Sequence, residues 1–291
     1  RAFALQRLAL NLGFSIGPAA GGLLATIDFR WLFYVDAATT LAAGVLLLVT
    51  FGWRRAHLPP RHADPTAPRV SPLRDGPFVA FLGLTLLTMM AFLQFSSTYP
   101  LYLYDHFGLT KPMIGLMFVV NTALIVAVEM PLIQAAKGWP LLRTIGWGSG
   151  VACLGFGMLP FGSSAAYAVL AMVVVTVGEM LSFPLAAAYV AGRSRPGAES
   201  HYMSWFVATP SAAWILGPAL GAALYQANPA ATWWACLAVA GVVVVGYHRL
   251  AARVGDGPCE TLESVNVAVT SVAPPADLPL EQLPTPAEST R

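Results

Sequence analysis

Apolar runs of about 20 residues recur along most of the chain and are separated by short polar loops. A helix of roughly this length crosses the ~30 Å hydrocarbon layer of a bilayer, where only elements that satisfy their own backbone hydrogen bonds are stable. The pattern predicts an all-α membrane protein with eight transmembrane helices. We place them at residues 3–27, 31–51, 78–102, 113–134, 142–161, 165–191, 203–225 and 230–247.

The composition excludes a water-soluble domain. Hydrophobic residues make up 57% of the chain and charged residues only 10%, whereas charged residues are about 25% of a soluble domain. The three cysteines lie far apart, and two of them, Cys153 and Cys236, fall inside apolar runs where a thiol packs as a small hydrophobe. We therefore expect neither a disulfide framework nor a zinc site.

The histidines do not support an intramembrane enzyme or a haem protein. All five lie in loops or at the ends of expected spans, and none belongs to a His-Glu-x-x-His run. Metal-dependent proteolysis and haem ligation within the bilayer both need histidines inside a span. We expect no catalytic activity, no cofactor and no bound metal. The histidines are His57, His62, His106, His201 and His248.

The basic residues predict the orientation in the membrane. Of the 16 Lys and Arg residues, all but Arg30 and Lys111 fall in alternate loops that would share one side of the bilayer. Cytoplasmic loops carry the excess of Lys and Arg, and one missed or invented span would scramble this split. We expect a multi-pass protein of the inner (plasma) membrane with both termini in the cytoplasm.

Two segments 200 positions apart form an internal repeat. Residues 17–24 read Gly-Pro-Ala-Ala-Gly-Gly-Leu-Leu, and residues 217–224 read Gly-Pro-Ala-Leu-Gly-Ala-Ala-Leu, so five of eight positions are identical. Both copies fall at the same depth of helices that run outward from the cytoplasm, which favours a duplicated bundle over coincidence. The second copy contributes Gly217, Pro218 and Gly221.

A duplicated six-helix plan divides the chain into four parts. Residues 1–51 would be the last two helices of an N-terminal bundle whose first four helices are absent from this sequence. Residues 52–77 hold five Arg and several Pro residues and would form a cytoplasmic linker. Residues 78–247 would form a six-helix C-terminal bundle. The Pro-rich, aperiodic residues 248–291 would form a disordered cytoplasmic tail.

Residues 11–22 resemble the antiporter motif in the fifth helix of major facilitator drug:proton antiporters, among them bacterial multidrug-resistance proteins. The family has a further glycine nine positions before the first match, and here that position is Ala4. Residues 30–38, 94–102 and 178–184 are similar to the family's helices six, seven and ten. The positions that match the antiporter motif are Gly13, Gly17, Pro18, Gly21 and Gly22.

The resemblance implies the major facilitator fold, with the eight helices equivalent to helices 5 to 12 of the family. It implies a bend at Pro18 that seals the transport path during exchange, although glycines four residues apart also suit simple helix packing. It further implies a bacterial inner-membrane location and a protein that acts as a monomer when complete.

Three acidic residues, Asp36, Glu129 and Glu179, fall inside the expected spans. A carboxylate at the bilayer centre costs about 2.5–3.5 kcal/mol even on lenient insertion scales, so each needs a reason to be there. Glu179 lies near the middle of its span, and the Lys and Arg residues within the expected spans, Arg7 and Arg143, lie near span ends and not beside it. A buried carboxyl of this kind can take up and release a proton near neutral pH.

We predict that Glu179 couples protons or holds a cationic substrate, with Thr176 and Ser182 on its face of the helix. The alternative is a neutral Glu that bonds a neighbouring helix. Glu129 either joins this chemistry or reaches the cytoplasmic interface. Asp36, near the outer end of its helix, either contributes to the site or complements the helix dipole.

Two polar residues in other spans are further candidates. Gln94 and Asn121 either line the transport cavity or hydrogen-bond neighbouring helices. Aromatic groups near Gln94 would suit a lipophilic cation through cation–π attraction.

The favoured function is proton-coupled efflux of hydrophobic or cationic small molecules by alternating access. A nutrient site usually needs fixed charged groups, and the lack of embedded Lys and Arg favours a loosely specific lipophilic substrate. The alternatives are uptake of a nutrient such as a sugar or peptide by proton symport, and an inactive truncated remnant. The expected partners are a small-molecule substrate, protons and the lipid bilayer, with no nucleic acid.

Overall fold

The computed structural model describes residues 26–51, 71–194 and 197–258, together with separate positions between residues 13 and 24. This part of the chain is helical and contains no strand. Seven of its helical segments are long and apolar enough to cross a membrane, which confirms the predicted all-α membrane fold. They are Arg30–Thr50, Gly76–Ser96, Lys111–Ala135, Leu141–Phe161, Ala165–Arg193, Glu199–Ala227 and Ala231–Val254.

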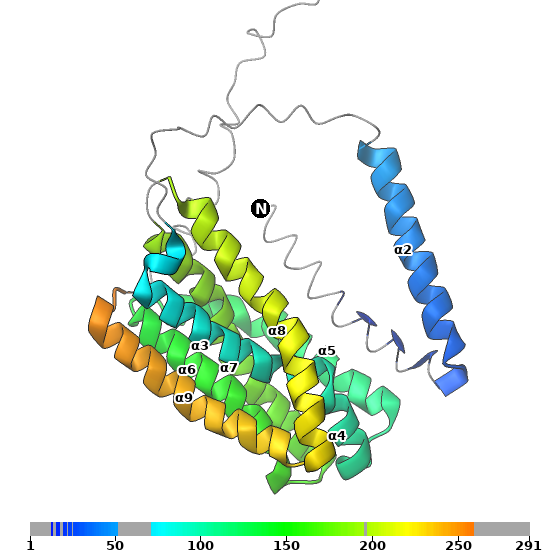
Figure 1. The fold of residues 1–291 in the computed structure, drawn as a ribbon. Helices are drawn as coiled ribbons and strands as arrows, with labels where there is room; N and C mark the ends of the chain where they lie inside the picture. The colour runs from blue at the N-terminus through cyan, green and yellow to red at the C-terminus, as the bar shows by residue number, and fades with distance from the viewer. Residues whose placement is uncertain are drawn as a thin grey trace, which may run out of the picture.

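The expected first span, residues 3–27, falls largely outside the described residues. Gly13, Gly17 and Gly21 are helical, whereas Pro18 and Gly22 lie outside the description. Helix α2 (Arg30–Phe51) follows and lies apart from the other helices in Figure 1. None of the residues in its membrane-spanning stretch is buried.

The remaining helices pack into one bundle (Figure 1). Helix α6 lies between α7 and α9 and packs extensively on both, while α3 packs on α8 and α9, and α5 packs on α7. The elements are the 3-10 helix η1 (Pro72–Arg74), α3 (Gly76–Phe92), the 3-10 helix η2 (Leu93–Ser96), α4 (Thr98–Phe107), α5 (Lys111–Ala135), α6 (Leu141–Gly157), the 3-10 helix η3 (Leu159–Phe161), α7 (Ala165–Arg193), α8 (Glu199–Ala227) and α9 (Ala231–Val254).

Glycines set the close approach of α6 to both neighbours. A Cβ atom at Gly178 of α7 would overlap the backbone nitrogen of Ala152 on α6. On the other side, a Cβ atom at Gly150 of α6 would overlap the side chain of Val244 on α9. Small residues allow helix backbones to approach closely, and van der Waals packing of this kind drives helix association in lipid.

Two aromatic-rich clusters fill the interior, one toward each end of the bundle. One contains Tyr99, Phe156 and Trp233, with the Phe156 ring stacked on the Trp233 ring at a centroid distance of 6.3 Å. The other contains Phe81 and Tyr247, whose rings meet edge to face at 5.9 Å. Since aromatic side chains bury large apolar surfaces, these clusters fix how the helices pack.

The predicted single helix at residues 78–102 is wrong, because the structure divides this segment in two. Helix α3 ends at Phe92, the 3-10 helix η2 follows, and α4 starts at Thr98 after the non-helical Ser97, with φ −119° and ψ −84°. Pro100 has no backbone N–H to donate to the preceding turn, and its ring disfavours a continuous helix there. The Ser97 hydroxyl donates to the Leu93 carbonyl oxygen at 3.2 Å and stabilises the break.

The last helix and the segment after it also differ from the sequence prediction. Helix α9 continues to Val254 instead of ending at residue 247. The following residues dock on the start of α6, where the Asp256 carboxylate accepts hydrogen bonds from the backbone N–H groups of Leu142 at 2.8 Å and Arg143 at 3.3 Å. Residues 248–258 are therefore ordered, and the rest of the expected tail lies outside the description.

Candidate functional site

Glu179 of α7 and Asn121 of α5 meet where the two helices pack together. The Asn121 Nδ2 atom donates a hydrogen bond to the Glu179 Oε2 atom at 2.9 Å. The same nitrogen donates to the Thr176 Oγ1 atom at 3.0 Å, one turn before Glu179 on α7. Two candidates that the sequence placed in separate spans, together with the flanking Thr176, thus form one polar cluster.

The bonding of Thr176 determines which way the Asn121 amide points. The Thr176 hydroxyl donates its only proton to the Met172 carbonyl oxygen at 2.7 Å, so it can only accept from Asn121. The nitrogen of the Asn121 amide therefore faces α7, and its two protons serve Thr176 and Glu179. Asn121 is therefore the donor in its bond to Glu179, and it can orient the carboxyl whether that carboxyl is ionised or protonated.

Burial differs within this polar cluster. Asn121 is 7% exposed and Thr176 is 0% exposed, whereas Glu179 is only partly buried. Ser182 was expected on the same helix face as Glu179, but its hydroxyl is not directed to Asn121 or Thr176. The Ser182 hydroxyl instead donates to the Gly178 carbonyl oxygen at 2.8 Å and lines a separate small cavity.

The other two acidic candidates occupy different surroundings. Glu129 is 6% exposed and lies on the buried face of α5 with Asn121 and Ile125. The eight-residue separation of Glu129 from Asn121 corresponds to roughly 12 Å along the helix axis, at about 1.5 Å per residue. Asp36 is exposed on α2, and the structure does not bring it to the Glu179 cluster.

Gln94 lies in the 3-10 helix η2, and its side chain uses both amide protons and its oxygen in hydrogen bonds. The Nε2 atom donates to the Met90 carbonyl oxygen at 3.0 Å and to the Gly217 carbonyl oxygen of α8 at 2.8 Å. The Oε1 atom accepts from the Thr98 hydroxyl at 2.8 Å, and the Ser97 hydroxyl, which donates to Leu93, lies 3.3 Å from it. Gln94 therefore ties the break between α3 and α4 to α8.

The second copy of the internal repeat makes room for Gln94. A Cβ atom at Gly221 would overlap the Oε1 atom of Gln94, and a Cβ atom at Gly217 would lie 3.2 Å from the Met90 carbonyl oxygen. Pro218, between them, belongs to the interior of α8. Gly221 is needed because the side chain of Gln94 packs directly on the backbone of α8, while Gly217 lies close to the backbone of α3.

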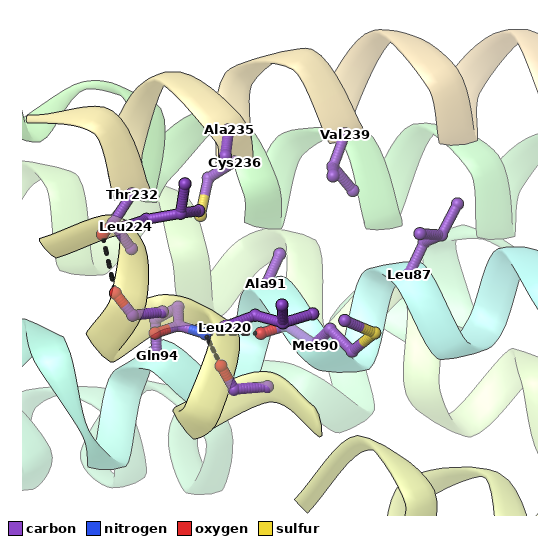
Figure 2. A pocket seen from close by; sticks show the side chains of 12 residues that line it. Leu87, Met90, Ala91, Gln94, Leu220, Leu224, Thr232, Ala235, Cys236 and Val239 are labelled. Carbon is purple, nitrogen blue, oxygen red and sulfur yellow. Dashed lines mark hydrogen bonds between the residues drawn. The ribbon is translucent and has the colours of Figure 1, made fainter. Parts of the chain in front are cut away.

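Gln94 also lines a cavity of about 100 Å³ between α3, α8 and α9. Figure 2 shows Leu220 and Leu224 from α8 and Ala235, Cys236 and Val239 from α9 around it, with Gln94 at one end. The Thr232 hydroxyl donates to the Gly221 carbonyl oxygen at 3.2 Å. The lining is mostly apolar, and the polar atoms of Gln94 are already bonded within the protein.

Sequence reasoning missed an ionic cluster at the start of α3. Arg193 of α7 donates two hydrogen bonds to Asp75, from Nε at 3.0 Å and from Nη2 at 2.7 Å. The Tyr202 hydroxyl of α8 lies 3.2 Å from Asp75 Oδ2. The signal was present, because Asp followed by Gly-Pro is typical of a helix N-cap, and Asp75 accepts from the Phe78 N–H at 3.3 Å.

The surroundings of Asp75 favour its charged form. Burial raises the pKa of this carboxyl, but the hydrogen bonds from Arg193, Phe78 and Tyr202 and the positive charge of Arg193 together outweigh burial. The pKa of Asp75 therefore lies below its ordinary value, and the pair is an ionised link between α3 and α7.

No three His, Cys, Asp or Glu side chains of the described ranges gather into a group that could hold a metal ion. What the Glu179 cluster offers chemically is one carboxyl that can exchange a proton or attract a cation within a spanning helix.

Comparison with known proteins agrees with this architecture. The family model described as Major Facilitator Superfamily matches residues 1–209. Two proteins of Bacillus subtilis (strain 168), named Uncharacterized MFS-type transporter YqjV and Uncharacterized MFS-type transporter YttB, are each 26% identical to the chain. The first similarity covers 211 residues, 69% of this chain and 50% of the relative. The second covers 231 residues, 77% of this chain and 57% of the relative.

The chain spans about half the length of the curated relatives it matches. The family match extends over more than half of the chain, from the start to α8. The helices and their apolar composition are those of a multi-pass membrane protein. The chain therefore belongs to the Major Facilitator Superfamily.

Proposed function

We propose that the protein is a proton-coupled secondary transporter that exports hydrophobic or cationic small molecules, with Glu179 as the group that carries the proton. The names of the two relatives support transport in general. The observation that carries the specific proposal is the 2.9 Å hydrogen bond from Asn121 to Glu179 between two spanning helices. Because Asn121 is neutral, protonation of Glu179 leaves an oxygen that can still accept this bond.

The partial exposure of Glu179 supports a role in exchange. Asn121 and Thr176, which hold it, are buried, while Glu179 itself keeps exposed surface. A carboxyl that is held by buried neighbours and keeps some exposed surface can bind a proton or a cationic substrate, but not both at once. Such competition for one carboxylate is the simplest physical basis for exchange.

Glu129 is proposed as a second proton-carrying group. It lies on the same buried face of α5 as Asn121, roughly 12 Å farther along the helix at ~1.5 Å per residue, toward Ala135 and the basic loop that contains Lys137. We propose that this basic end of the bundle faces the cytoplasm, as expected from the excess of Lys and Arg there. A proton released from Glu179 would then pass near Glu129 on its way inward.

The distribution of charge supports a lipophilic substrate. Within the seven described spans, Lys and Arg occur only near helix ends, as with Lys111 at the start of α5 and Arg193 at the end of α7. A site for an anionic or highly polar nutrient would need fixed positive groups at its centre. We further propose that residues 1–51 belong to the N-terminal bundle, that residues 52–77 form the linker, and that the complete protein is a monomer.

Transport of a hydrophobic cationic dye in inside-out membrane vesicles tests the proposal. With an acidic vesicle interior, the full-length protein should accumulate dye, and Glu179→Gln should lose this accumulation while remaining in the membrane. Glu199→Gln is a matched control, because Glu199 is an exposed carboxylate at the start of α8. Wild-type accumulation by Glu179→Gln would remove Glu179 from coupling, and dye movement in the opposite direction would indicate uptake.

A further inference from the structure

Five residues that carry hydroxyl groups line a small cavity inside the bundle. The cavity lies between α3, α6, α7 and α9, and the space open to a water-sized sphere is about 10 Å³. Each of the five residues is buried, at 3% exposure or less. The hydroxyls belong to Thr85, Thr88, Ser149, Ser182 and Tyr247.

The protons of three of these hydroxyls are committed to the backbone. Thr85, Thr88 and Ser182 each donate to the carbonyl oxygen four residues earlier in their own helix, at 2.9, 2.9 and 2.8 Å. A hydroxyl has one proton and two lone pairs. The oxygens of these side chains can therefore act only as acceptors toward the cavity.

The contact between Thr85 and Tyr247 fixes a fourth proton. Their hydroxyl oxygens lie 3.1 Å apart. Because the Thr85 proton is used on the backbone, the Tyr247 hydroxyl must be the donor in this pair. The fifth hydroxyl, that of Ser149, also bonds the Tyr247 hydroxyl. The oxygens of Thr88 and Ser182 therefore offer lone pairs without protons to the cavity, and an occupant that donates hydrogen bonds would fit them.

We propose that this cavity is a binding site for one water molecule, which donates to two of the hydroxyl oxygens and links α3 to α7. The open space matches the minimum that a single water needs, and buried waters bind where several polar groups converge. A bare cation fits less well, because no carboxylate lines the cavity and neutral hydroxyls compensate poorly for the loss of its hydration.

The site lies beside a point of α7 where the helix lacks one backbone hydrogen bond. Ser182 precedes Pro184, which lacks the backbone N–H that would bond the preceding turn. Ser182 lies three residues beyond Glu179. A bound water at Ser182 would join this part of α7 to Thr88 of α3. The site thus holds the segment that carries the proposed proton group, although its occupancy does not depend on transport.

X-ray radiolysis of the full-length protein in detergent tests the site, because hydroxyl radicals formed from a bound water modify the side chains beside it. We expect Tyr247, which lines the cavity and is 1% exposed, to be modified. Met172 and Met180 are matched controls, since both are 0% exposed and neither lines the cavity. If the extent of modification of Tyr247 is no greater than that of these two methionines, the proposal is wrong.

Variants of the acceptors provide a second test. Thr88→Val and Ser182→Ala each remove one hydroxyl with little change of shape. Together they should lower the extent of Tyr247 modification several-fold. The double variant should still elute as a single species, which shows that it is folded. Unchanged modification in the double variant would contradict the site. An unfolding temperature that rises with sodium chloride but not with choline chloride would identify a cation as the occupant and also overturn the proposal.

Discussion

The amide nitrogen of Asn121 and a carboxylate oxygen of Glu179 lie 2.9 Å apart, although 58 positions separate the two residues in the chain. Asn121 donates to Thr176 as well, so its amide cannot rotate away without losing two bonds. The packing of α5 on α7 therefore fixes the position of the Glu179 carboxyl.

Removing the Asn121 amide should impair transport without abolishing it. We expect Asn121→Ala to lower the dye transport rate roughly 10- to 100-fold, because a hydrogen bond to a charged group contributes about 1.5–3 kcal/mol and ~1.4 kcal/mol corresponds to one factor of ten. Initial rates in vesicles measure the effect. Asn228→Ala, in the loop between α8 and α9, should transport normally. Equal rates for the two variants would show that Asn121 does not position Glu179.

A methyl group at Gly221 should destabilise the bundle. Gly221→Ala places its Cβ on the Oε1 atom of Gln94, and overpacking of this kind typically costs about 1–3 kcal/mol. Thermal unfolding in detergent should show a lower melting temperature. Gly241→Ala on α9 is the control, because nothing lies within 4 Å of its added Cβ, and it should be neutral or slightly stabilising.

A double variant separates this clash from a general intolerance of alanine. If Gln94 is the group displaced, Gln94→Ala combined with Gly221→Ala should cost less than the sum of the two single changes. Additive losses would mean that Gly221 and Gln94 act independently.

The Asp75–Arg193 pair predicts a loss of stability in acid. The folded-state pKa of Asp75 lies below its unfolded value, so the pair stabilises the fold fully above the unfolded pKa of about 3.9. This stabilisation is lost as the pH falls through the lower folded pKa. Melting temperatures from pH 7 down to about 3 should therefore fall more steeply for the wild type than for Asp75→Asn. Parallel curves would contradict the pairing.

The Asp256 carboxylate should contribute to stability as an N-cap of α6. Asp256→Ala should cost about 0.5–2 kcal/mol, as for other N-cap losses. Asp256→Asn keeps one oxygen, which can accept the shorter bond from the Leu142 N–H group, and replaces the oxygen that accepts from Arg143. It should therefore cost less than Asp256→Ala, since the lost ion pair with Arg143 is long at 3.5 Å and half exposed on the Arg side. Chemical denaturation of the two variants side by side measures the difference.

The spans could be predicted from the sequence because hydrophobic length is a local property. Each of the seven described spans overlaps an expected one, from α2 to α9. The break at residues 93–97 was not predicted, although Pro100 was visible, because proline in a spanning helix is often tolerated. The bond from Gln94 to Gly217, 123 positions away, also holds this segment, and no local pattern shows such a contact.

The sequence identified the residues of the candidate site, but it could not predict which of them are in contact. Glu179 and Asn121 are conspicuous as polar groups inside apolar runs, so the cost of burying them identifies both. Their pairing depends on the rotation of α5 against α7, which no local pattern fixes. Likewise, Asp256 docks on α6 through backbone groups, whereas its Pro-rich surroundings in the sequence predict disorder.

The central claim, that Glu179 takes up and releases a proton, is tested most directly by infrared difference spectroscopy of the full-length protein in lipid. Lowering the pH across the neutral range should produce a protonated-carboxyl band that is absent in Glu179→Gln and present in Glu199→Gln. A difference spectrum that Glu179→Gln leaves unchanged would contradict the claim.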